Sequence, residues 1–88
     1  MKRAEAIAIY KEIMKFAECM GSNVYNVSLS KKNDQTSEGY QIRIKTSVVN
    51  EIIEPIKDIA KKHNKAVKEE KTEIIVYEPK KNFIYLFL

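Results

Sequence analysis

The sequence contains little cysteine or glycine and no tryptophan: among 88 residues there are one cysteine, two glycines and two prolines. A single cysteine, Cys19, excludes an internal disulfide and a zinc site built from paired cysteines. The two glycines, Gly21 and Gly39, lie far apart, which excludes a glycine-rich phosphate-binding loop. Stability must therefore come from the packing of side chains.

Long hydrophobic runs are also missing. The longest, Phe83–Leu88, is far shorter than the roughly 20 residues that cross a bilayer. The basic start, Met1–Arg3, is not followed by the apolar stretch of a secretory signal. With 44% hydrophobic and 32% charged residues, the chain has enough apolar side chains for one core. We expect a single domain over residues 1–88, a cytoplasmic location and no membrane contact.

Lysine supplies most of the basic residues, and isoleucine and glutamate are abundant. This composition resembles that of hyperthermophile proteins. An AT-rich genome favours the same lysine and isoleucine bias, so the source of the bias stays open.

Two segments carry apolar residues at helical spacing. The first covers residues 3–20 and ends at the following glycine. The second covers residues 47–64, with Thr46 or Ser47 as its N-cap. Pro55 lies inside this second segment, and the continuous apolar periodicity across it predicts one kinked helix.

Five further segments have the character of strands. Apolar and polar residues alternate over 25–30 and 40–45, which predicts a hairpin with one apolar face, and strands follow at 65–69, 72–78 and 83–88. The order is α-β-β-α-β-β-β. Two helices that each have one apolar stripe can cover one face of a sheet. We therefore predict an α+β two-layer sandwich, with an antiparallel sheet and both helices on one face.

Residues that could perform catalysis are few. The chain has one histidine, His63, and one cysteine, Cys19, at the ends of different predicted helices. The acidic pairs Glu51/Glu54 and Glu69/Glu70 have lysine neighbours, which favours ion pairing in solvent over acid and base catalysis. We expect no enzymatic activity, no cofactor and no metal.

Nucleic-acid binding is the alternative function. The net charge is +4 and the pI about 9.2, which favours a polyanionic partner. The polar face of the first hairpin has no aromatic side chain for base stacking, but phosphate contacts need none. The candidate contacts on or beside this hairpin are Lys31, Lys32, Arg43 and Lys45.

The last predicted strand is apolar on both of its faces. Alternation sends one set of side chains to each face, and two helices cover only one face of the sheet. A second copy of the chain would cover the other set; the competing interpretation is a central strand covered by the loop 31–39. We predict a non-enzymatic interaction module that forms a homodimer through Phe83, Ile84, Tyr85, Leu86, Phe87 and Leu88.

Overall fold

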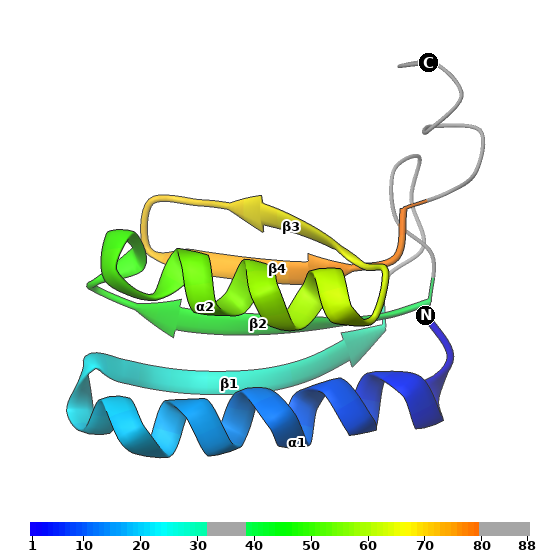
Figure 1. Ribbon diagram of the computed structural model, residues 1–88, viewed down its shortest axis with the longest axis horizontal. Coiled ribbons are helices and arrows are strands. Elements are labelled where there is room, and N and C mark those ends of the chain that lie inside the picture. The colour runs from blue at the N-terminus through cyan, green and yellow to red at the C-terminus, as the bar shows by residue number, and fades with distance from the viewer. Residues whose placement is uncertain (32–38, 80–88) are drawn as a thin grey trace.

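The computed structural model describes residues 1–31 and 39–79. These residues include a four-stranded sheet, and the α-helices lie beside it (Figure 1). In chain order the elements are α1 (Arg3–Met20), the short 3-10 helix η1 (Gly21–Asn23), β1 (Val24–Lys31), β2 (Tyr40–Thr46), α2 (Val49–Lys62), β3 (Ala66–Glu69) and β4 (Glu73–Tyr77). The predicted α+β class and the order α-β-β-α-β-β are confirmed. The seventh predicted element, Phe83–Leu88, lies outside the described residues.

The sheet is antiparallel, with the strand order β1-β2-β4-β3. Register places Ile42 of β2 beside Val76 of β4, and Ile44 beside Ile74, so these four buried side chains share one face. Both helices contribute to the same buried cluster and therefore cover that face. The helical members of the cluster are Ala6, Ile9 and Ile13 of α1 and Val49, Ile52, Ile53, Ile56 and Ala60 of α2.

The beginning of α2 differs from the sequence-based prediction. The helix begins at Val49 with Val48 as its N-cap, and no side chain caps it. The hydroxyl of Thr46 instead accepts a hydrogen bond from the amide of Val48 at 3.0 Å and donates one to the carbonyl of Asn23. Thr46 therefore joins the end of β2 to η1. A buried hydroxyl needs hydrogen-bond partners, and here it finds them outside the first turn of the helix.

The far ends of both helices agree with the prediction. α1 ends at Met20, and Gly21 follows with a φ of 61°, a left-handed value that favours glycine. α2 continues through Pro55 to Lys62. His63 then closes the helix, because its amide donates to the carbonyl of Ala60 at 3.1 Å.

The face of the sheet opposite the helices carries mixed side chains. Across the four strands, Ser28, Arg43, Ile75 and Lys68 are neighbours in register. Ile75 is only 7% exposed, although it belongs to the strand positions that point away from the core. This face thus presents polar and basic groups around an apolar centre.

Candidate functional site

A shallow groove lies between the second half of α1 and the beginning of β1, two elements that run side by side (Figure 1). Its volume is about 350 Å³. Tyr10, Met14 and Ala17 recur at helical spacing, so they form a second apolar stripe on α1 beside the buried one. The other lining residues are Glu18 of α1 and Val24, Tyr25, Asn26 and Val27 of β1.

Tyr25 is exposed at the β1 side of this groove. Its side chain is 65% exposed, more than any other large apolar side chain of the described chain. The register between β1 and β2 shifts between Val24 and Asn26, which leaves Tyr25 without a partner in the ladder. Such an irregularity redirects a side chain at a strand edge. The groove therefore combines an aromatic ring with a partly buried apolar floor.

β1 is also an edge of the sheet. Its eight residues pair with β2 on one side, and in residues 1–31 and 39–79 no strand pairs with the other side. From Val24 to Ser30 the strand carries no charged side chain, and its first charge is Lys31. The unpaired amide and carbonyl groups of such an edge can accept another strand. Groove and edge together form the candidate site, which we call the β1 edge site.

The basic residues predicted to contact nucleic acid are only partly brought together. Arg43 and Lys45 lie two residues apart on β2, but Arg43 pairs with Glu73 at 3.2 Å, and Lys45 is opposite Glu73 in register. Lys31 lies with its ammonium 6.0 Å from the centre of the Tyr40 ring. The fourth candidate, Lys32, lies outside the described residues. A carboxylate thus lies beside both basic side chains of β2 and offsets part of their charge.

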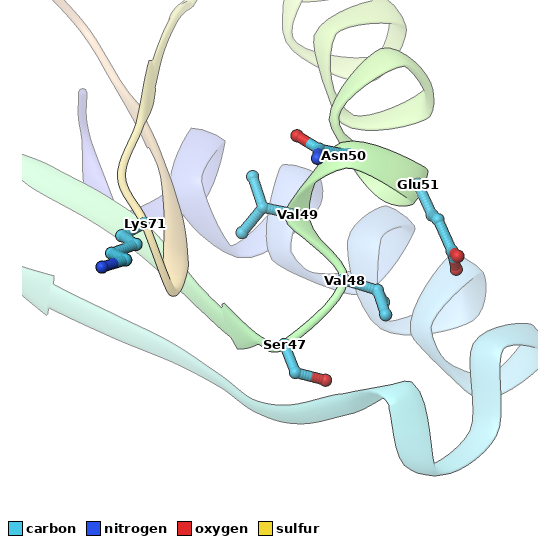
Figure 2. Close-up of a pocket in the computed structure, with 6 residues that line it drawn as sticks. All are labelled: Ser47, Val48, Val49, Asn50, Glu51 and Lys71. Atoms are coloured by element: carbon cyan, nitrogen blue, oxygen red, sulfur yellow. The ribbon is translucent and has the colours of Figure 1, made fainter.

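A second pocket, of about 240 Å³, opens at the start of α2 beside the turn between β3 and β4 (Figure 2). Figure 2 shows that its charged side chains diverge, with Lys71 on one side of the pocket and Glu51 on the other. Catalysis needs groups that converge on one reacting atom. The pocket is lined by Ser47, Val48, Val49, Asn50, Glu51 and Lys71.

His63 and Cys19, the two candidate catalytic side chains, have different surroundings. Nε2 of His63 lies 3.5 Å from Oε2 of Glu12, whereas Cys19 is exposed near the end of α1. The other oxygen of Glu12 accepts a hydrogen bond from Lys62 at 2.7 Å. That bond, with the nearby positive charge, lowers the pKa of Glu12 despite partial burial. These contacts connect α1 to the end of α2. In the described part of the chain, no three His, Cys, Asp or Glu residues gather as metal ligands would.

A buried lysine, Lys65, lies just after the end of α2, and its amide donates to the carbonyl of Ala60 at 2.8 Å. The side chain of Lys65 is 5% exposed, and its ammonium lies 2.8 Å from Glu78 and 3.0 Å from Glu5. Burial alone would lower the pKa of Lys65, but its hydrogen bonds to the two carboxylates outweigh burial and raise it. The bond from Lys65 likewise lowers the pKa of Glu78. The N-terminal amine of Met1 also pairs with Glu78, at 3.5 Å, so this cluster joins α1 to the β3 and β4 end of the sheet.

Comparison with known proteins identifies no relative: no family model, no curated protein and no solved structure matches this chain. None of the described helices has the length and apolar character that a membrane span requires.

The β1 edge site was not predicted from the sequence. Two signals for it were present: a second apolar stripe on the first helix, at Tyr10, Met14 and Ala17, and a strand with no charge before Lys31. The sequence-based prediction placed Tyr10 and Ala17 on the single apolar stripe of the first helix, did not include Met14, and assigned the uncharged strand to an ordinary hairpin. These two features indicate a candidate site only once the strand order, which places β1 at an edge of the sheet, is known.

Proposed function

We propose that the chain is a small, non-enzymatic protein-interaction module that associates with itself as a homodimer. The observation that carries this proposal is the β1 edge, an eight-residue strand with no charge before Lys31 and with one side that no other described strand pairs with. Proteins usually protect such edges with charge, proline or short length. An unprotected edge next to an apolar groove is suited to receive an extended segment.

The lining of the groove supports binding by shape and backbone pairing. Among the lining residues that the structure describes, Glu18 alone is charged, and Tyr10, Met14 and Val27 supply apolar surface. Recognition at such a site comes from main-chain hydrogen bonds, with side-chain pockets adding specificity. A two-fold dimer is the commonest assembly of soluble proteins, which favours a second copy as the partner.

We also propose a cytoplasmic location. Cys19 is the only cysteine and is exposed. A free, exposed thiol persists in a reducing compartment and is oxidised more readily outside one. The location can be checked by following a C-terminally tagged chain in fractionated cells, and recovery of the chain outside the cytoplasm would contradict it.

Sedimentation equilibrium over a range of protein concentrations tests the dimer. We expect the intact chain to have twice the chain mass and the Tyr25→Lys/Asn26→Lys variant to be monomeric, because two charges on the edge oppose strand addition. Glu69→Lys is the matched control, since it makes the same change in net charge on the edge of β3 and should leave the dimer intact. A monomeric intact chain at every concentration would refute the proposal.

A further inference from the structure

We infer that the segment Phe83–Leu88 of a second copy occupies the β1 edge site, as an added strand beside β1. This inference rests on the proposed self-association and specifies which segment of the second copy is bound. Reciprocal exchange of the segment between two chains gives a closed two-fold dimer.

The site offers two kinds of contact that an extended apolar segment can use. The outer side of β1 presents backbone amide and carbonyl groups, and the groove beside it has an apolar floor that includes Tyr10, Met14 and Val27. An added strand places alternate side chains on the two faces of the sheet. One set therefore lies over the groove, while the other lies on the helix-free face.

The segment Phe83–Leu88 has the composition that this site requires. It contains no charge, no proline and no glycine, and its aromatic and branched residues favour strands. Phe83, Tyr85 and Phe87 form one set and the intervening residues the other, so both sets are apolar. The groove can bury one set, while the other set lies on the helix-free face beside the polar side chains of β1, such as Ser28.

Charge indicates the direction in which the segment binds. The last turn of α1 contains no basic residue, and Glu18 lines the groove. The C-terminal end of a helix is also electronegative. Lys80 and Lys81 precede the apolar segment and would neutralise this end of the groove. The segment is therefore parallel to β1, with Phe83 near Val24.

Reach limits how the two copies can be arranged. Three residues, 80–82, connect Pro79 to Phe83, and the four extended residue steps from Pro79 to Phe83 span roughly 14 Å. The exchange therefore requires Pro79 of one copy to lie within about 14 Å of the start of β1 of the other copy.

Cross-linking between two singly labelled chains tests the inference. In a Cys19→Ser background, one chain carries Ala17→Cys in the groove and the other carries Phe83→Cys. After mixing, a short bismaleimide should produce the cross-linked heterodimer. Ala4→Cys is the matched control, because it is a small exposed residue in the first turn of the same helix. With this control, cross-linking should fall to background.

The outcomes separate this inference from the proposed function. If sedimentation shows a dimer but neither Phe83→Cys nor Leu88→Cys cross-links to Ala17→Cys, the inference is wrong. The proposed homodimer would remain supported. A monomer would overturn both. A chain that carries both Ala17→Cys and Phe83→Cys and cross-links at monomer mass would show that the segment fills the groove of its own chain. Cross-linking from position 88 in place of 83 would overturn the parallel direction.

Discussion

The two edges of the sheet differ in length and in charge, two properties that control strand addition. β3 has four residues, two of them the charged Lys68 and Glu69. β1 has eight residues and no charge until Lys31. Short length and charge are the devices by which native proteins protect an edge. Because both edges belong to one sheet, the contrast supports the proposal that β1, and not β3, is the edge that receives a partner.

The two helices also differ in how much apolar surface they leave uncovered. α2 buries a single stripe against the sheet, and its remaining positions are mostly charged. α1 buries Ala6, Ile9 and Ile13 but leaves Met14 and Ala17 only half-buried on a neighbouring stripe. An apolar stripe without full cover adds little to the stability of one chain and much to a contact between chains. We therefore propose that the two stripes of α1 have separable roles, one in folding and one in association.

The largest expected effect comes from substituting two adjacent residues of α1, one on each stripe. Ile13→Ala should lower the free energy of unfolding by about 2 to 5 kcal/mol, because Ile13 is fully buried and the change leaves a cavity. Urea denaturation at a fixed protein concentration measures this loss. Met14→Ala, one position along, should weaken the dimer in sedimentation and leave the stability of the monomer nearly unchanged. Equal destabilisation by both variants would remove the distinction between the two stripes.

The next effect concerns the cluster that secures the β3 end. Lys65→Met should destabilise the fold by about 1 to 3 kcal/mol, because it leaves the carboxylates of Glu78 and Glu5 without their buried partner. The partial exposure of those carboxylates keeps the loss below that of a fully buried pair. Lys68→Met is the control: its side chain is 62% exposed and pairs with Glu70 at 3.3 Å, so the change should be under about 0.5 kcal/mol. Thermal unfolding of the two variants compares them directly.

Low pH should weaken the ion pairs of the same cluster. The resulting loss in the free energy of unfolding should be smaller than that caused by Lys65→Met. The pKa of Glu78 is lowered in the folded chain by its hydrogen bond from Lys65, so the folded state binds its proton less readily than the unfolded state. This contribution is present above pH 4.5, the ordinary value, and is lost as the pH falls through the lowered pKa. Glu12, whose pKa is also lowered, adds to the loss over the same range.

Urea denaturation between pH 6 and pH 2 measures the dependence, with the limits chosen to bracket roughly two units on each side of an ordinary carboxyl pKa. Glu78→Gln should reduce the acid-induced loss. Glu54→Gln should retain it, because Glu54 is exposed and its ion pair with Lys57 is long, at 3.9 Å. An unchanged acid profile for Glu78→Gln would mean that Glu78 does not stabilise the fold.

Much of the fold was predictable, because its signals are local. The periodicity of residues 3–20 and the alternation around Ile42 and Ile44 determine helix and strand without long-range information. The predicted N-cap of α2 was wrong. The hydroxyl of Thr46 donates to the carbonyl of Asn23, which lies 23 residues away in the sequence, so no local sequence pattern identifies this partner. The salt bridges of Lys65 likewise depend on the positions of Glu5 and Glu78, which are distant in sequence.

The β1 edge site was unpredictable for a related reason. The sequence of a hairpin does not determine which of its two strands lies at the edge of the sheet. Here β4 pairs with β2, which leaves β1 outside. Had β4 paired with β1, the same uncharged strand would be central and its lack of charge would have no consequence for binding. The predicted association segment, Phe83–Leu88, lies outside the described residues and stays a prediction.

Nucleic-acid binding by the helix-free face should be the smallest effect, since Glu73 offsets the charge of the basic side chains of β2. Any affinity of the intact chain for a DNA duplex should be weak, and two cations can give a logarithmic salt dependence of at most roughly two. Fluorescence anisotropy at low salt measures it for the intact chain, for Arg43→Ala/Lys45→Ala and for Glu73→Gln. If the face binds phosphate at all, the double variant should abolish binding and Glu73→Gln should strengthen it, because the neutral amide leaves Arg43 free for phosphate. Tight, steeply salt-dependent binding that the double variant loses would instead place function on this face, and the uncharged edge of β1 would then have to be explained without a partner.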